Sequence, residues 1–149
     1  IVVMSAGIQL NPSVWIVIPV HNRKAITLAC LATLKQQGDL AQYTIVVVDD
    51  GSTDGTSEAV RSVYPEVIVL RGDGNLWWTG AIRMGMEYAI QQGAEFCFWL
   101  NDDCSPQPGA IATLLETCRQ NPMTIAGGQS VDPDTQHPSY GGILCEGTR

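Results

Sequence analysis

The chain has 149 residues, of which 45% are hydrophobic and 15% are charged, and its formal net charge at pH 7 is −7. The length suffices for one domain with a hydrophobic core, and the low charged fraction is typical of a buried parallel sheet covered by helices. The acidic balance argues against a nucleic-acid binder, and no apolar run is long enough for a transmembrane segment.

The predicted elements alternate between strands and helices along the chain. Strands are expected at 14–18, 43–48, 67–70 and 95–100, and a fifth begins at 124–126. Helices are expected at 24–36, 54–62, 79–92 and 106–119, where Ser52-Thr53-Asp54 caps the second helix and Ser105-Pro106 opens the last. This alternation with short loops predicts an α/β fold with a parallel sheet. The Gly-, Pro-, Asp- and Ser-rich tail from Gly127 is predicted as loop.

The five cysteines are odd in number and include no C-x-x-C pair, so neither a disulfide framework nor a zinc site is supported. Cys30 falls inside a helical pattern and Cys97 inside an apolar strand. Both are therefore expected to be core thiols in a reducing compartment, which predicts a cytoplasmic location.

Polar residues follow the carboxyl ends of three predicted strands. The residues are His21-Asn22-Arg23, Asp49-Asp50-Gly51-Ser52 and Asn101-Asp102-Asp103. Because the carboxyl ends of parallel strands meet at one edge of the sheet, where ligands bind in open α/β folds, these side chains should gather there. Adjacent aspartates repel each other and are costly to desolvate, and a divalent cation is the usual way to offset that cost. The pattern therefore predicts a metal-assisted site.

Each of these clusters also has a purely structural explanation. The segment 49–54 can be a turn followed by a helix cap, and it is not an EF-hand loop because the twelfth residue from Asp50 is Arg61 rather than glutamate. The segment 101–103 can cap the next helix, although two acids and an asparagine exceed what a cap requires. Trp77 and Trp78 can be a packing pair over the sheet or an aromatic wall beside a sugar or base.

The glycines at 72–74 do not form a dinucleotide-binding fingerprint, because the third glycine position falls on Trp77 and the loop follows the third strand. The chain also lacks the P-loop motif with its lysine. Basic residues near the predicted edge are limited to Arg23, Lys24, Arg71 and Arg83. A diphosphate could therefore approach the acidic edge only with a divalent cation between them.

Four motifs in this order together resemble family 2 glycosyltransferases of the GT-A fold. They are the strand that ends in Pro19-Val20-His21-Asn22-Arg23, the run Asp49-Asp50-Gly51-Ser52-Thr53-Asp54-Gly55-Thr56, the segment from Gly74 to Gly85, and Asn101-Asp102-Asp103 at the family's D-x-D position. The resemblance covers about residues 13–145, and the tryptophan pair is closest to the rhamnosyltransferase-like branch. It implies a Rossmann-like three-layer sandwich with a mostly parallel sheet, in which residues 1–149 form a nucleotide-sugar-binding domain.

The resemblance also implies an activity: metal-dependent, inverting transfer of a sugar from a UDP-, dTDP- or GDP-linked donor to a hydroxyl acceptor, as in polysaccharide biosynthesis. The acceptor would be a saccharide or a lipid-linked saccharide, the latter placing the protein at the inner face of the membrane. By position, Pro19, His21 and Asp49 would border the base, Asp102 would contact the ribose or metal-bound water, and Asp103 would ligate Mn²⁺ or Mg²⁺. The remaining nucleotide-sugar-binding residues would be Asn22, Asp50, Gly51, Asn75, Arg83 and Asn101.

The family's catalytic base is an Asp or Glu well past residue 149, and Tyr140-Gly141-Gly142 resembles the loop before the acceptor region. Residues 1–149 are therefore expected to be the donor-binding half of a longer enzyme, truncated before the acceptor-binding half. Two alternatives remain: a nucleotide-sugar-binding module without catalysis, and a phospho-acceptor receiver domain. A receiver needs an acid pair after the first strand and a lysine after the last, and the sequence has neither.

Overall fold

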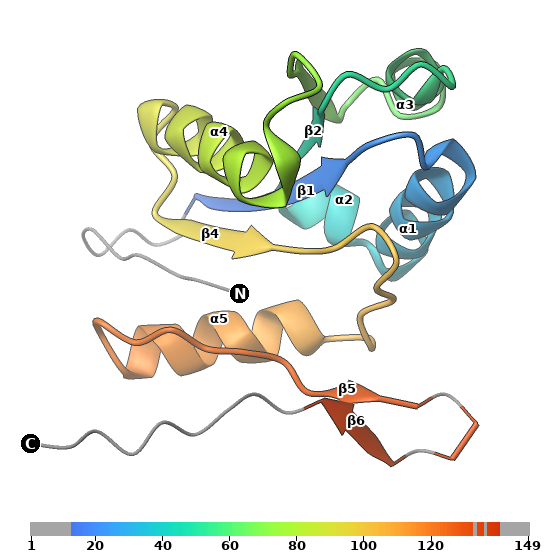
Figure 1. Ribbon diagram of the computed structural model, residues 1–149. Helices are drawn as coiled ribbons and strands as arrows, with labels where there is room; N and C mark the ends of the chain where they lie inside the picture. Colours follow the sequence, from blue (N-terminus) through green and yellow to red (C-terminus); the bar gives the residue numbers. More distant parts are fainter. Residues whose placement is uncertain (1–12, 133, 136, 141–149) are drawn as a thin grey trace, which may run out of the picture.

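The computed structural model describes residues 13–132, 134–135 and 137–140, and its core is a four-stranded parallel sheet (Figure 1). The strands are β1 Val14–Val20, β2 Thr44–Asp49, β3 Ile68–Arg71 and β4 Phe96–Trp99, in the order β3-β2-β1-β4. The helices are α1 Lys24–Gln37, α2 Asp39–Gln42, α3 Thr56–Val63, α4 Trp77–Gln91 and α5 Ala110–Gln120. A two-stranded antiparallel hairpin, β5 Ser130–Val131 and β6 Pro138–Tyr140, follows α5. The predicted α/β fold with a parallel sheet is confirmed.

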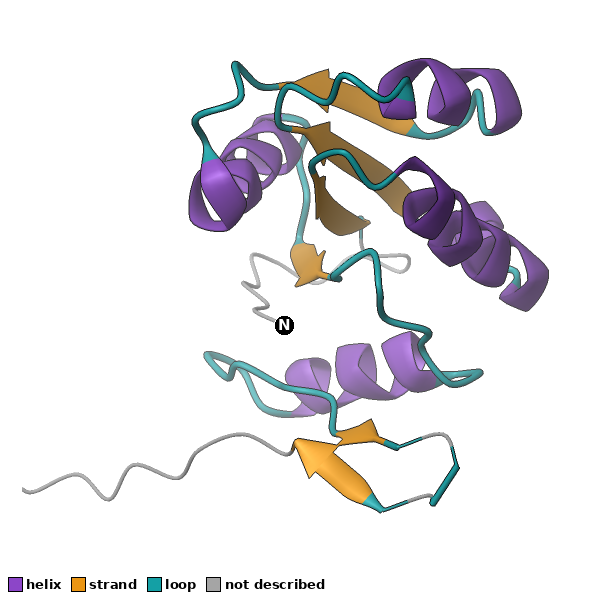
Figure 2. Ribbon diagram, turned by 45° about the vertical axis from the view of Figure 1, so that its right-hand side comes forward, coloured by secondary structure: helices purple, strands orange, loops and turns teal. Residues whose placement is uncertain are grey.

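Strand β1 is buried along its whole length because helices cover both faces of the sheet (Figure 2). Ile16 and Ile18 belong to the core shared with α1, α3 and α5, whereas Trp15 and Val17 belong to the core shared with α4. Successive strand residues point to opposite faces, so a continuous apolar run serves two cores at once. This arrangement makes the three layers of the fold.

Helix α4 packs directly on the sheet through Gly85. A Cβ atom there would lie 2.3 Å from Cγ1 of Val17 and 3.0 Å from Cγ2 of Val48. Only a residue without a side chain allows this approach. The close contact brings the amino end of α4 to the carboxyl ends of β1 and β2.

Three sequence-based expectations were wrong in the second half of the chain. The last helix begins at Ala110 rather than at 106, because Gly109 adopts a left-handed φ of 79° and breaks the helical path. The expected strand at 124–126 is absent from the described residues, where Ile125 is exposed. The tail from Gly127, expected to be loop, instead contains the β5–β6 hairpin.

Helix α3 begins two residues later than the sequence predicts. Helix α3 begins at Thr56 after Gly55, and Asp54 Oδ1 accepts a hydrogen bond from the Thr56 N–H at 3.0 Å, so one of the three expected capping residues acts at this end. The glycines 141–142 of the predicted acceptor-proximal loop lie outside the described residues. Within the described residues, no helix combines the length and the apolar character that a membrane crossing requires.

Candidate functional site

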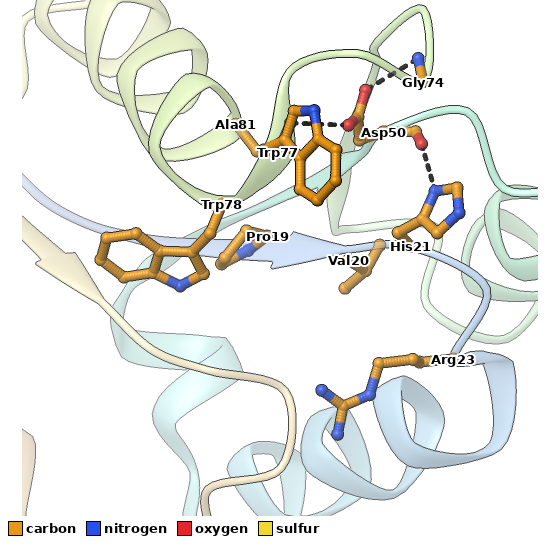
Figure 3. Close-up of a pocket in the computed structure, with 9 residues that line it drawn as sticks. All are labelled: Pro19, Val20, His21, Arg23, Asp50, Gly74, Trp77, Trp78 and Ala81. Atoms are coloured by element: carbon orange, nitrogen blue, oxygen red, sulfur yellow. Dashed lines mark hydrogen bonds between the residues drawn. The ribbon is translucent and has the colours of Figure 1, made fainter.

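A cavity of about 460 Å³ opens at the carboxyl end of β1, beneath the amino end of α4 (Figure 3). It is lined by Pro19, Val20, His21, Arg23, Asp50, Gly74, Trp77, Trp78 and Ala81. Strands β2 and β3 are added on one side of β1, and β4 is added on the other. Open α/β sheets bind ligands in the crevice at such a switch point, at the carboxyl ends of the strands. Two of the three predicted polar clusters, those after β1 and β2, supply residues to this cavity.

Asp50 organises one wall of the cavity. Its Oδ1 accepts a hydrogen bond from the Gly74 N–H at 2.8 Å and its Oδ2 accepts one from the Trp77 N–H at 2.9 Å. The Gly51 backbone, with a φ of 69°, passes so close to Gly74 that a Cβ would lie 2.8 Å from its Cα. The buried carboxylate and the adjacent glycine together hold the loop after β3 against the cavity.

His21 joins the ends of β1 and β2 beside Asp50, on the same side of the cavity (Figure 3). Its Nδ1 donates to the Asp50 carbonyl oxygen at 2.5 Å, and its Nε2 accepts from Asn22 Nδ2 at 2.9 Å. Asn22 also accepts a hydrogen bond from the Thr53 N–H at 2.8 Å. His21 therefore faces the cavity, while Asn22 ties two loops together outside it.

Asp49 lies apart from the cavity although it was predicted to border a base there. It is fully buried, its Oδ1 accepts from the Ser52 N–H at 2.8 Å, and its Oδ2 accepts from the Ser57 hydroxyl. Both oxygens thus hold the turn into α3. The neighbouring residue, Asp50, is the aspartate that reaches the cavity.

Arg23 forms ion pairs with both aspartates of the acidic loop after β4, residues 101–103. Asp102 is 3% exposed and lies 3.2 Å from Arg23 Nη1, while Asp103 is 52% exposed and lies 3.0 Å from Arg23 Nη2. Thr27 Oγ1 donates to Asp102 at 3.1 Å. Burial raises the pKa of Asp102, against the opposing effects of Arg23 and Thr27. A guanidinium therefore offsets the repulsion that the sequence argument assigned to a metal ion.

The first residue of this loop, Asn101, contacts the tryptophan pair. Asn101 Oδ1 accepts a hydrogen bond from Trp78 Nε1 at 2.9 Å, and the Trp78 ring meets Trp99 edge-on at 5.9 Å between centroids. Trp78 is therefore held in place, whereas Trp77 is 81% exposed over the cavity. Both rings line the cavity, and Trp78 also packs against Trp99.

Two further predicted site residues, Asn75 and Arg83, also lie away from this cavity. Arg83 pairs with Glu87 at 2.7 Å and lines a second, mostly apolar hollow of about 320 Å³ beside Trp78 and Trp99. Asn75 is exposed, and its N–H donates to Asp73 Oδ1 at 2.9 Å. Neither side chain is brought to the group formed by Pro19, His21 and Asp50.

The sequence places Arg23 in the polar cluster after the first strand and among the nearby bases, but predicts no role for Arg23 or for Thr27. Arg23 is the N-cap residue of α1 and Thr27 lies in the first turn, where the Thr27 hydroxyl donates to the Arg23 carbonyl oxygen at 3.0 Å, so both residues lie at the same face of this helix end. Their spacing of four residues, combined with a motif ending in Arg23 at the sheet edge, was available from the sequence. It could not show that the acidic loop would fold back onto this face.

The metal-ligating side chains at this edge could hold a metal ion only together with oxygens from a bound substrate. The described residues contain no group of three or more His, Cys, Asp or Glu side chains that could hold an ion by themselves. Asp103 is the exposed carboxylate of the loop; its Oδ2 pairs with Arg23 and its Oδ1 lies 4.0 Å from the Cys104 thiol. Magnesium is commonly held by one or two carboxylates together with substrate phosphates, so Asp103 suits a shared site of that kind.

The parallel sheet, with helices on both faces and a cavity at the strand ends, matches the GT-A fold of solved glycosyltransferases. The fold matches a mannosyltransferase from Pyrobaculum calidifontis, solved in complex with GDP-Man and Mn²⁺, with a TM-score of 0.66 at 20% identity. It also matches TarS of S. aureus in complex with UDP-GlcNAc, with a TM-score of 0.57 at 19% identity over 72% of this chain and 31% of that one.

The chain belongs to glycosyl transferase family 2, whose sequence profile matches residues 15–142. It is 31% identical over 121 residues to glycosyltransferase AglE of Haloferax volcanii, a match that covers 78% of this chain and 39% of AglE. The match to the mannosyltransferase covers 84% of this chain and 37% of that enzyme. The chain thus spans about two fifths of the length of these two relatives.

Proposed function

We propose that this chain binds the nucleotide-diphospho-sugar donor of a glycosyltransferase that transfers the sugar to a hydroxyl acceptor. The observation that carries the proposal is the cavity at the strand reversal of a family 2 domain, with Asp50 on one wall and Arg23 on another. The two solved neighbours were captured with GDP-Man and with UDP-GlcNAc, which supports a nucleotide-sugar ligand for the same fold. The donor nucleotide of this protein is to be found among UDP, dTDP and GDP.

The proposed base-binding residues are Pro19, His21 and Asp50. A carboxylate oxygen that accepts one hydrogen bond retains a second lone pair, so Asp50 can still accept from a base N–H after binding the loop after β3. Asp49, Asn22 and Gly51 would then act by holding the turn between β2 and α3. This assigns to Asp50 the contact that the motif alone predicted for Asp49.

The proposed diphosphate-binding group is the acidic loop with Arg23. A guanidinium recognises phosphate oxygens through paired N–H donors, and Arg23 lies on the cavity wall. Asp103 would hold Mn²⁺ or Mg²⁺ jointly with the diphosphate, and such an ion, when bound, would stabilise the charge that the departing diphosphate acquires. Asp102, buried against Arg23 and Thr27, would orient the guanidinium rather than contact ligand.

We further propose that transfer inverts the anomeric centre, as the family resemblance implies. Direct displacement requires a carboxylate that takes the proton from the acceptor hydroxyl on the opposite face of the sugar. We place that base in the region that corresponds to the remaining three fifths of the relatives. The residues at the cavity described above would hold the donor and its leaving group.

We also propose several finer assignments, most of which follow from the resemblance to the family. They are the rhamnosyltransferase-like branch, a saccharide or lipid-linked saccharide acceptor, a role in polysaccharide biosynthesis, and a cytoplasmic location at or near the inner face of the membrane. The four described cysteines are all free thiols, which supports a reducing compartment.

The test is the release of nucleoside diphosphate from UDP-, dTDP- and GDP-linked sugars by the complete protein, with Mn²⁺, Mg²⁺ or EDTA. We expect metal-dependent turnover of one nucleotide class and a loss of at least tenfold in kcat/KM for Asp103→Asn. The control is Glu66→Gln, an exposed acid in the turn before β3 at the opposite edge of the sheet, which should leave turnover unchanged. Tight donor binding without turnover on any acceptor would favour the non-catalytic module instead.

A further inference from the structure

Trp77 has a backbone conformation that tryptophan rarely adopts. Its φ is 56°, in the left-handed region, at the first residue of α4. A bulky residue at positive φ is an outlier because its Cβ crowds the backbone, whereas glycine has this conformation at no steric cost. Strained residues of this kind cluster at functional sites.

The packing of the fold does not explain why a tryptophan occupies this position. The side chain is 81% exposed, so it buries little apolar surface in return for the strain. The hydrogen bond from the Trp77 N–H to Asp50 Oδ2 uses only the backbone and would form with glycine. The indole must therefore serve something other than the stability of this domain.

The indole lies over the cavity, beside the two groups proposed to meet the base. Figure 3 shows the Trp77 ring projecting from the amino end of α4 toward Pro19 and Val20, with Asp50 and His21 on one side. Trp78 lies on the other side and is tied to Asn101 of the acidic loop. Trp77 thus offers an open aromatic face next to a hydrogen-bond acceptor.

We propose that Trp77 is a base-binding residue whose indole stacks on the planar base of the donor nucleotide. The inference rests on the proposed function and extends it by naming the residue that recognises the base. A flat heterocycle can present its face to Trp77 and an N–H at its edge to Asp50 at the same time, which fits the adjacency of the two groups. Aromatic stacking on a base is sequence-tolerant and is lost when the ring is removed.

The experiment compares Trp77→Gly, Trp77→Ala and Trp77→Phe in the complete protein by calorimetric titration with UDP, dTDP and GDP. We expect the glycine and alanine variants to bind the preferred diphosphate at least about tenfold more weakly, and the phenylalanine variant to stay within about threefold of wild type. Inorganic pyrophosphate, which has no base, should bind all four proteins equally. The preferred nucleotide is titrated in its sugar-linked form as well. If the glycine and alanine variants lose affinity for that form alone and bind the free nucleoside diphosphate as tightly as wild type, the inference is overturned, because the indole would then face the sugar.

Thermal unfolding separates this role from a structural one. Glycine relieves the left-handed strain and alanine does not, so Trp77→Gly should have a Tm at or above that of wild type and about 2–4 °C above that of Trp77→Ala. A structural role would instead lower the Tm of both variants together with their affinity.

The matched control is Met123→Gly. Met123 also has a positive φ, 67°, and is 99% exposed, but it lies beyond α5 and does not line the cavity. It should show the same relief of strain with unchanged nucleotide binding. If wild type binds none of the three diphosphates, the proposed function fails together with the inference. If wild type binds and Trp77→Gly binds equally well, the inference alone fails.

Discussion

Asp50→Asn is expected to loosen the wall of the cavity, because the aspartate uses both carboxylate oxygens to hold one loop. Its two oxygens accept the N–H groups of Gly74 and Trp77 at 2.8 and 2.9 Å, in a buried position. An asparagine retains one acceptor oxygen and turns an NH₂ group toward the other N–H. The variant therefore loses one charge-assisted hydrogen bond and leaves a backbone donor unpaired.

The size of the effect follows from these two losses. A hydrogen bond to a charged group contributes about 1.5–3 kcal/mol, and an unpaired buried donor costs about 1–3 kcal/mol. Since the loop can relax toward solvent, we expect the free energy of unfolding to fall by about 2–4 kcal/mol, which corresponds to a Tm lower by about 5–15 °C. Nucleoside diphosphate affinity should fall with it, because Asp50, Gly74 and Trp77 all line the cavity.

Urea unfolding of Asp50→Asn beside Asp73→Asn provides the assay. Asp73 belongs to the same loop and accepts a single N–H, that of Asn75 at 2.9 Å, from an exposed position that asparagine can reproduce. Its substitution should change the free energy of unfolding by less than about 0.5 kcal/mol. If the two variants lose the same amount, the argument that the buried carboxylate anchors the loop is refuted.

Three further predictions concern the fold around the site. Gly85→Ala should lower the free energy of unfolding by about 1–2 kcal/mol, since a Cβ 2.3 Å from Val17 overpacks the α4 interface by more than the gain in helix propensity. Gly80→Ala, whose Cβ would have Leu76 side-chain atoms as its three nearest neighbours, at 3.1 Å or farther, should be near neutral in the same urea titration. Equal losses for the two variants would contradict overpacking at Gly85. The Thr56 hydroxyl and the Lys24 N–H hold the pKa of Asp54 below its usual value, so its contribution to stability is present above about pH 3.9 and is lost as the pH falls through the lower folded pKa. The stability difference between wild type and Asp54→Asn should therefore shrink below about pH 4, and a difference that grows on acidification would reverse the sign. Burial raises the pKa of Cys30 to about 12 and that of Cys97 to about 11, so iodoacetamide at pH 8 should modify exposed Cys104 before Cys30 and Cys97, as peptide mass spectrometry would show. Modification of Cys30 or Cys97 in native protein at the rate of Cys104 would contradict their burial.

The sheet was predictable because its strands are buried on both faces. A run such as Val14–Val20 must be apolar throughout when helices cover both sides, and this distinguishes a central parallel strand from an amphipathic one. The hairpin β5–β6 was not predictable on that basis, because its residues are mostly exposed and carry no apolar periodicity. The start of α5 was misplaced because Pro106 permits a helix, whereas the left-handed Gly109 decides where it begins.

The clustering of polar residues at one edge of the sheet was also predictable. Which of them line the cavity and which hold a turn was not. Asp49 and Asp50 are neighbours in the sequence, but their side chains point in different directions. Asp49 is buried and accepts a hydrogen bond from Ser57, whereas Asp50 lines the cavity. Sequence spacing cannot resolve that choice. The role of Arg23 depends on the acidic loop folding onto α1, a tertiary contact between residues 79 or 80 positions apart in the chain.

We expect the strand-end cavity and Asp103 to bind a nucleoside diphosphate together with a divalent cation. The most direct measurement is calorimetric titration of wild type, Asp103→Ala and the control Glu66→Ala with UDP, dTDP and GDP, each with and without Mn²⁺. We predict binding of one diphosphate that Mn²⁺ strengthens in wild type and in the control, and a loss of that strengthening in Asp103→Ala. Mn²⁺-dependent binding that survives intact in Asp103→Ala, or the absence of binding for all three diphosphates in wild type, would contradict this expectation.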